Sequence, residues 1–401
     1  MRVMTDATQD RPWYRALAVP RSAELGLWPV IFALGLIAIG FHLANDAFLT
    51  PRNLSNLVMQ TGTLGAMTLG VVLVLLIGEI DLSIGAVSGF TACVMGILAT
   101  LHGWPAWAAI GAAVLLGASI GLVQGAWIVF FQAPSFIVTL AGLLIWQGLQ
   151  LRSLGDQNGQ LRIEDPGITG VASNFLPLWA GWALATAVIL VTVAYLAVRR
   201  VLAARSSYGT EPLAKDVSRA VLVALTSIAV VGVLNAHLGV PYLLIVLLVL
   251  TLGCAVVAGS TVFGRHIYAV GGNAEAARRT GIRVGALRVV IFMSASSLAS
   301  LAGVLEAARG YAVSVNSGGG NASLNAIAAA VIGGTSLFGG RGRLAGALLG
   351  ALVISSVQNG LALLGEGAAT QVVITGLILL AAITLDVTSR RRRLSPGARG
   401  A

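Results

Sequence analysis

Long apolar runs restrict the folds open to this chain more than any other feature. Several of them reach or exceed the ~18 residues that a helix needs to cross the hydrocarbon core of a membrane. Charged residues make up only 10% of the 401 residues, whereas a soluble domain carries about a quarter. The sequence therefore predicts an all-α integral membrane protein, a polytopic helical bundle. Its 50 glycines suit close helix–helix contact in lipid.

About twelve transmembrane spans can be placed, and together they form one transmembrane domain over residues 28–386. The expected spans are 28–44, 54–77, 82–101, 106–131, 135–151, 176–198, 220–234, 242–260, 286–308, 324–339, 344–364 and 369–385. A polar stretch, 152–175, separates the fifth from the sixth. The short seventh span and the Gly-rich tenth are the weakest, and either could be a broken or re-entrant helix. The count falls to ten if spans six and seven do not cross.

Basic residues lie in blocks at the ends of these spans. With the N-terminus inside, 21 of the 25 Lys and Arg residues fall in inside segments and four fall outside. This asymmetry follows the positive-inside rule, so the net charge of +10 reflects topology and predicts no nucleic-acid partner. Both termini are expected in the cytoplasm, 1–27 as a retained N-terminal segment and 387–401 as a basic tail.

No residues form a catalytic or metal-binding constellation. The scattered histidines and the cysteines within apolar runs are His42, His102, His237, His266, Cys93 and Cys254. The motif GxxxxGK[ST] of a phosphate-binding loop cannot occur, because the only lysine, Lys215, follows Ala214. We therefore expect no enzyme, no metal and no cofactor in this chain. If transport consumes ATP, another chain hydrolyses it.

The segment 261–288 is the longest run between Val240 and the tail that water must surround, and its middle predicts one short helix. Asn273 can cap the first free amides, and Gly281 can supply the left-handed residue at which the helix stops. Acidic and basic residues lie in its first and last turns, where the helix dipole favours each. The candidate residues are Gly271, Gly272, Asn273, Glu275, Ala276, Ala277, Arg278, Arg279 and Gly281.

A helix of about seven residues is too short to be stable alone in water, where ~12–15 residues are marginal. Either it is a solvated loop pinned by its own protein, or it docks into the groove of a partner. Glycines on both sides would let a partner approach the backbone closely.

Polar side chains within apolar segments have two open interpretations. Asp81 and Ser83 form a good helix start, and each of the others could hydrogen-bond a neighbouring helix. As a set they could also line a path for a polyhydroxylated solute, which needs donors and acceptors rather than charge. The candidates are Asp81, Ser83, Thr139, Asn325, Gln358 and Asn359.

Two glycine-containing segments, 77–85 and 332–340, echo each other in their Ile, Gly and Leu positions. Such an echo is typical of duplicated membrane architectures, and it also arises by chance in Gly-rich membrane sequences.

Five motifs resemble one known family, the monosaccharide permeases of bacterial ABC importers. They are GEIDLSIG (78–85), PSFIVTLAG (134–142), FGRHIYAVGGNAEAARRTGI (263–282), NAIAAAVIGGTSLFGGRGRLAGALLGAL (325–352) and QNGLALLG (358–365). Within that family the chain most resembles xylose permeases. Glu79 stands before Ile-Asp, where ribose-type members usually have Gly, and 199–219 resembles the connection within the extra helix pair of the xylose type.

The resemblance implies a multi-pass permease of the bacterial inner membrane whose segment 261–288 couples it to a cytoplasmic ATPase. That separate ATPase subunit would bind ATP and Mg. The other implied partners are a periplasmic or lipoprotein sugar-binding protein, a second copy of the chain in a homodimer, and membrane lipid. D-xylose is the implied cargo, with ribose, arabinose or galactose as alternatives.

An ion-driven secondary transporter is the competing hypothesis. It needs a buried titratable site, for which Glu79, Asp81 and Glu306 are the nearest candidates. A channel or a scaffold is a third class, and it would depend neither on ATP nor on an ion gradient.

Overall fold

The computed structural model describes residues 28–204 and 212–394. Its helices are α1 (Trp28–Ala44), α2 (Pro51–Leu76), α3 (Ile84–Thr100), α4 (Ala106–Phe131), α5 (Ser135–Leu154), α6 (Pro166–Ser173), α7 (Leu178–Ala204), α8 (Leu213–Asn235), α9 (Tyr242–Ser260), α10 (Val262–Gly272), α11 (Ala274–Arg279), α12 (Val284–Gly310), α13 (Ala322–Ile332), α14 (Leu344–Leu363) and α15 (Ala368–Leu394). A 3-10 turn, η3 (Gly155–Gln157), and two strands, β1 (Gln160–Arg162) and β2 (Ala312–Ser314), complete the described elements. The predicted N-terminal segment and the end of the predicted tail lie outside them.

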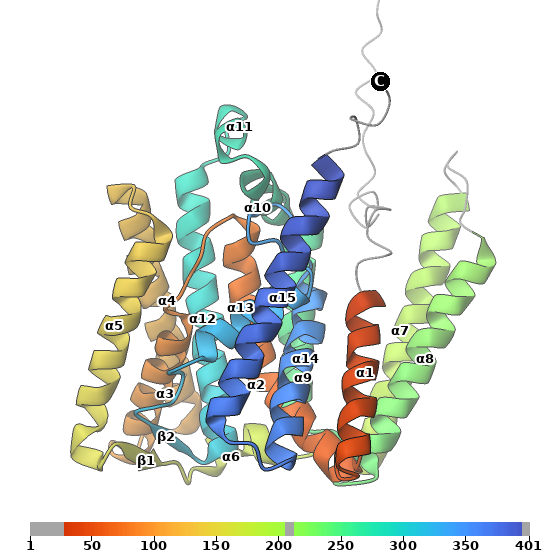
Figure 1. The fold of residues 1–401 in the computed structure, drawn as a ribbon, viewed down its shortest axis with the longest axis horizontal. Coiled ribbons are helices and arrows are strands. Elements are labelled where there is room, and N and C mark those ends of the chain that lie inside the picture. Colours follow the sequence, from red (N-terminus) through yellow and green to blue (C-terminus); the bar gives the residue numbers. More distant parts are fainter. Residues whose placement is uncertain (1–27, 205–211, 395–401) are drawn as a thin grey trace, which may run out of the picture.

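The long helices run side by side in a bundle (Figure 1). Eight are long and apolar enough to cross a membrane, and four shorter apolar helices, α1, α3, α13 and α15, account for the remaining expected spans. The prediction of an all-α polytopic membrane protein is confirmed. Helix α11 and the end of α15 lie at one end of the bundle, which we call the inner end, and the two strands and α6 lie at the outer end (Figure 1).

The seventh and tenth spans, the two that the sequence predicts least strongly, form helices of very different length. Helix α8 has 23 residues, so the seventh span is longer than expected and its pairing with α7 forms a full hairpin. Helix α13 has only 11 residues, which rise about 16 Å of the ~30 Å hydrocarbon core. The tenth span is therefore a half-helix, preceded and followed by irregular backbone.

Several short elements were not expected. The polar stretch 152–175 contains β1, which pairs antiparallel with β2 through Leu161 and Val313, and also α6. At the inner end, the segment 261–288 holds α10 as well as the predicted short helix. Helix α15 continues through residue 387 to Leu394, so the predicted start of the tail falls within a helix.

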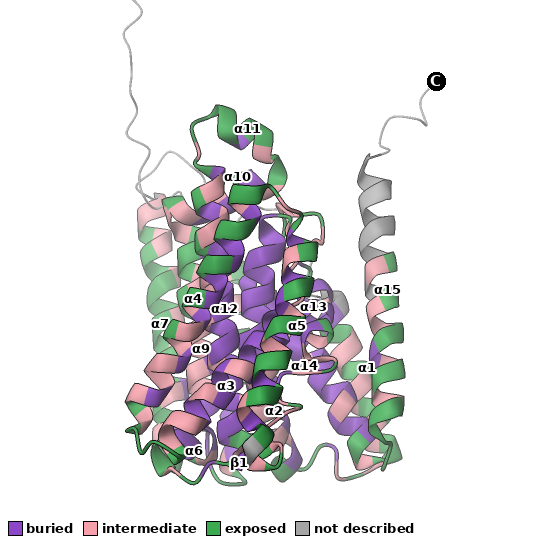
Figure 2. Cartoon of the chain, turned by 90° about the vertical axis from the view of Figure 1, so that its left-hand side faces the viewer, coloured by how far each residue is buried: buried purple, intermediate pink, exposed green. Residues whose placement is uncertain are grey.

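Helices α2 and α12 form the centre of the bundle. More than half of the apolar stretch of each is buried, 72% for α2 and 61% for α12, whereas α5 is only 22% buried. Figure 2 shows this buried centre, with α5 and α15 exposed on the outside.

Small residues let α12 approach α4 closely. A Cβ added at Gly117, Gly121 or Gly125 would collide with the backbone or side chains of α12. Close approach of this kind drives helix association in lipid, where the hydrophobic effect between helices is absent.

The two echoing segments become neighbours at the inner end. Both contain irregular backbone, which lies at 77–83 between α2 and α3 and at 333–343 between α13 and α14. We call these two stretches the α2–α3 break and the α13–α14 break. The amide of Gly340 donates a hydrogen bond of 2.9 Å to the carbonyl of Leu76. The pairing holds the two breaks together, and duplication of the architecture stays a hypothesis.

Candidate functional site: an inner docking helix and a polar helix break

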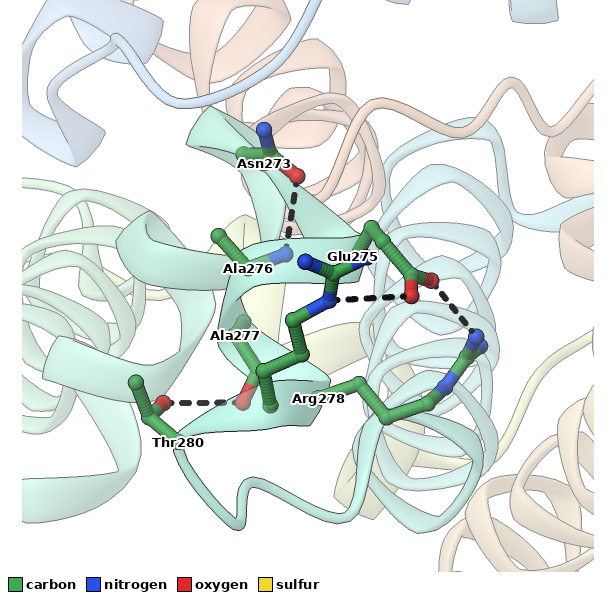
Figure 3. Close-up of polar contacts among 7 residues, drawn as sticks. Asn273, Glu275, Ala276, Ala277, Arg278 and Thr280 are labelled. Carbon is green, nitrogen blue, oxygen red and sulfur yellow. Dashed lines mark hydrogen bonds and ion pairs between the residues drawn. The ribbon is translucent and has the colours of Figure 1, made fainter.

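The predicted short helix is present as α11, with the predicted caps. The side-chain oxygen of Asn273 accepts a hydrogen bond of 2.9 Å from the amide of Ala276, and Thr280 donates one to the carbonyl of Ala277 (Figure 3). Gly281 has φ +89°, the left-handed conformation expected at the stop. Local capping therefore defines both ends of this six-residue helix.

Four of the six residues of helix α11 are exposed. Glu275 forms ion pairs with Arg278 at 3.1 Å and with Arg279 at 3.5 Å, and these side chains are 59–79% exposed. Exposed pairs of this kind contribute only about 0–1 kcal/mol. Ala277 is the one buried residue of the helix. The helix is thus fixed at its ends and leaves both arginines accessible.

The three candidate glycines have different surroundings. A Cβ at Gly271 would collide with the carbonyl of Leu76, so packing within this chain explains why the residue is a glycine. Gly272 has nothing within 4 Å of a built Cβ, and neither has Gly281. Only these last two leave room for a partner, whereas Gly271 packs inward.

Helix α10 connects α11 to both helix breaks. The hydroxyl of Tyr268 donates a hydrogen bond of 3.1 Å to the carbonyl of Gly342, in the break before α14. Burial raises the pKa of Tyr268, which further favours the protonated phenol that donates this hydrogen bond. Gly271 lies against Leu76, at the end of α2. A displacement of α10 would therefore move both irregular segments.

A second link between the inner surface and the α2–α3 break is an ion pair. Arg288, in the first turns of α12, lies 2.8 Å from the carboxylate of Glu79, whose side chain is only 13% exposed. The pair borders a cavity of about 460 Å³ that also contacts Gln132, Ser135 and Arg278. Residues of α11, α12 and the α2–α3 break thus share one cavity at the inner end.

The α2–α3 break holds a buried polar cluster. One carboxylate oxygen of Asp81 accepts hydrogen bonds from the amide and the hydroxyl of Ser83, at 2.8 and 2.7 Å. The Ser83 hydroxyl also contacts the amide group of Gln124, and Thr139 accepts from the amide of Leu82 at 3.2 Å. The structure therefore brings together three of the predicted residues, Asp81, Ser83 and Thr139.

Two members of this cluster were not predicted. Gln124 comes from α4, where a lone amide inside an apolar span was its only sequence signal. Ser323 lies in the first turn of α13. Its hydroxyl donates a hydrogen bond of 2.8 Å to the carbonyl of Leu82 and accepts one from the amide of Gly85. A serine in a small-residue stretch carries no comparable signal.

The other predicted path residues are not in this hydrogen-bonded cluster. Asn359 and Asn53 exchange two side-chain hydrogen bonds, at 2.8 and 3.0 Å, and Asn53 also donates to the carbonyl of Phe48. This contact joins α14 to α2 near their outer ends. Asn325 and Gln358 are half-buried, on α13 and α14.

No group of three or more metal-ligating side chains exists within residues 28–204 and 212–394.

A bundle of twelve apolar helices, interrupted by polar segments and carrying a short exposed helix at its inner end, is typical of a membrane permease. Comparison with protein families is consistent with this class. The model of a family described as "Branched-chain amino acid transport system / permease component" matches residues 53–383. The chain belongs to this family, and it is a transport subunit of the bacterial inner membrane rather than an enzyme.

Individual relatives are sugar permeases by name. The xylose transport system permease protein of Escherichia coli (strain K12) is 35% identical over 397 residues, covering 96% of this chain and 100% of that protein. Its Haemophilus influenzae counterpart is 35% identical over 374 residues, 93% of this chain and 99% of that protein. The ribose import permease protein of E. coli (strain K12) is 32% identical over 357 residues, 89% and 92% of the two chains. No solved structure matches the chain.

Proposed function

We propose that this chain is the transmembrane permease subunit of an ATP-driven importer of D-xylose. Relatives named for xylose transport match over 93–96% of the chain at 35% identity, against 30–32% identity for those named for ribose import. The α7–α8 hairpin and Glu79 agree with the xylose-type features of the sequence. Ribose, arabinose or galactose is the alternative cargo.

The observation that carries an ATP-driven mechanism is helix α11. It is capped at both ends, mostly exposed, and joined through α10 to both helix breaks. A helix held in this way suits a groove on a cytoplasmic ATPase, which would bind ATP and Mg. On the outer side, a periplasmic or lipoprotein sugar-binding protein would deliver the sugar, and a second copy of the chain would complete a homodimer.

Coupling follows as a shift of populations between two orientations of the permease. Movement of the ATPase would displace α11, and α10 would carry that movement to Leu76 and Gly342. The Glu79–Arg288 pair would transmit it from α12 to the α2–α3 break. The polar groups at that break supply donors and acceptors for a neutral sugar.

The test is ATP hydrolysis and sugar uptake by the reconstituted complex with binding proteins loaded with each candidate sugar. We expect xylose-loaded protein to stimulate both most strongly. Equal or greater stimulation by ribose would reassign the cargo within the same family.

The same preparation tests the ion-driven alternative. Of its three candidate groups, Glu79 is paired with Arg288, and one carboxylate oxygen of Asp81 accepts two hydrogen bonds from Ser83. We therefore expect uptake to require the ATPase and to survive a protonophore that collapses the ion gradient. Uptake without the ATPase, abolished by the protonophore, would reject the importer.

A further inference from the structure

One face of α5 is polar along the length of the helix. Ser135, Thr139, Trp146 and Gln150 recur at helical spacing, so they lie on one side. The opposite side is apolar and exposed, as at Leu144. Helix α5 stands at the left edge of the bundle in Figure 1 and faces the viewer in Figure 2, and it packs against α3.

This face begins in the cluster at the α2–α3 break. Ser135 accepts from the amide of Ile80, and Thr139 accepts from that of Leu82. A Cβ at Gly142 would lie 3.2 Å from the indole nitrogen of Trp146 and would collide with the amide of Gln124. Polar atoms therefore continue without a gap from the break to the middle of α5.

Farther out, the face meets the end of β2 and the irregular backbone that follows it. The amide nitrogen of Gln150 donates to the carbonyls of Ser314 and Ser317, at 2.8 and 2.9 Å. Gly318 then packs against Gly85, in the first turn of α3, and the helix rises about 22 Å from there to its outer end. Residues 315–321 thus reach mid-depth before α13 begins.

Part of this irregular backbone is open. Asn316 and Gly320 are exposed, and the side-chain nitrogen of Gln147 lies 3.5 Å from where a Cβ at Gly319 would stand. Non-helical backbone at membrane depth is tolerated only where it is buried in protein or lines a water-filled cavity. An open stretch of it beside a polar helix face therefore indicates contact with water or a polar solute.

Three buried polar atoms on this face and at the adjoining α2–α3 break have no hydrogen-bond partner within the described residues. They are the indole nitrogen of Trp146, a donor, and one oxygen each of Gln150 and Asp81, both acceptors. Gln150 and Asp81 are 1% and 3% exposed. Unpaired buried groups cost free energy, and a solute entering between α3 and α5 would supply their partners.

An aromatic surface lies between these atoms. The rings of Phe90 and Trp146 are stacked, with centroids 5.9 Å apart and an interplanar angle of 19°, and both residues are half-buried. Aromatic rings with a few convergent donors and acceptors are typical of sites for neutral polar ligands. A monosaccharide offers C–H groups to the rings and hydroxyls to the polar atoms.

We propose that Trp146 and Gln150, with Phe90 and the backbone of 315–321, form a sugar-contact site within the membrane, between α3 and α5. The site rests on the proposed function for the identity of its cargo. It assigns the passage of sugar to the polar face of α5 and to residues 315–321, which precede the half-helix α13.

The first test is uptake by the reconstituted complex carrying Trp146→Phe, which removes the indole donor and retains a ring against Phe90. We expect uptake per ATP hydrolysed to fall about 2- to 10-fold, the range for loss of one hydrogen bond. Retention of the ATPase and of the binding protein should be unchanged. Trp127→Phe, at a tryptophan of α4 that is 54% exposed, is the matched control and should leave uptake unchanged.

The second test uses adjacent positions of α5 in a background with Cys93→Ala and Cys254→Ala. Gln147 belongs to the polar face, whereas Gly148 is exposed with nothing within 4 Å of a built Cβ. During turnover, a water-soluble maleimide should modify Gln147→Cys and not Gly148→Cys, because thiols need water to ionise. Saturation with sugar-loaded binding protein should slow the modification.

Equal labelling of the two cysteines, or none at Gln147→Cys together with normal uptake in Trp146→Phe, would overturn the site. Failure of the proposed function looks different, because the wild-type complex would then import no monosaccharide.

Discussion

Helix α11 and the polar face of α5 are both assigned to contact with another molecule, but they are built in opposite ways. Every cap and ion pair of α11 joins residues three or four positions apart. The face of α5 depends on α3, α4 and residues 315–321, and Gln150 bonds to carbonyls 164 and 167 positions away. A surface for a protein partner can thus be formed locally, whereas a solute path must be assembled between helices.

The largest effect is expected from reversing both exposed charges of α11. Arg278→Glu with Arg279→Glu breaks the pairs with Glu275 and places acid at the helix C-terminus, against the dipole. Like charges at an interface cost several kcal/mol, so we expect at least ~100-fold weaker retention of the ATPase in pull-down assays.

The control for that variant is Arg162→Glu, at an arginine whose side chain is 79% exposed at the outer end. It should retain the ATPase fully. If the double variant also retained the ATPase fully, α11 would be an ordinary loop. It could then no longer be compared with α5 as a surface that binds a partner.

A comparable loss is expected from the glycines that flank α11, for two different reasons. Gly281→Val forces a β-branched residue to φ +89°, so the helix stop is lost and α11 changes shape. Gly272→Val has free space in this chain, so it should fold normally and obstruct only a docked partner. We expect both to reduce sugar-stimulated ATP hydrolysis, and circular dichroism and thermal unfolding to reveal a defect in Gly281→Val alone. Normal hydrolysis in Gly272→Val would mean that the partner does not approach the backbone there.

A smaller effect is expected from the link between the two regions. Glu79→Gln removes the ion pair with Arg288, leaving a half-buried guanidinium without its carboxylate. We expect ATPase retention to persist while uptake per ATP falls about 10- to 100-fold, since a hydrogen bond between charged groups contributes ~1.5–3 kcal/mol. Exchange of the charges, Glu79→Arg with Arg288→Glu, should recover part of the uptake. Uptake equal to wild type in Glu79→Gln would show that coupling passes only through α10.

The smallest effect on transport is expected at Asn359. Because Asn359 exchanges two hydrogen bonds with Asn53, Asn359→Leu should leave buried amide groups unpaired and lower stability by about 1–3 kcal/mol. Thermal unfolding should detect this loss, while uptake per folded molecule should be unchanged. Reduced uptake at normal stability would instead indicate that Asn359 lines the solute path.

The sequence alone determined the features that depend on short range or on composition. Apolar length and the distribution of arginines predict the helical membrane bundle and its orientation, because the cost of burying charge in lipid acts on each segment separately. Asn273 and Gly281 predict both ends of α11, because a cap acts within four residues.

Only the tertiary structure decided how separate helices meet. It shortened the tenth span to the half-helix α13, brought Gln124 and Ser323 to Asp81, and paired Asn359 with Asn53. These contacts join residues 41 to 306 positions apart, and a lone Gln, Ser or Asn in an apolar run has the same local pattern whether it packs, pairs or faces a solute. Its role is set by which helix the close packing of small residues places opposite it.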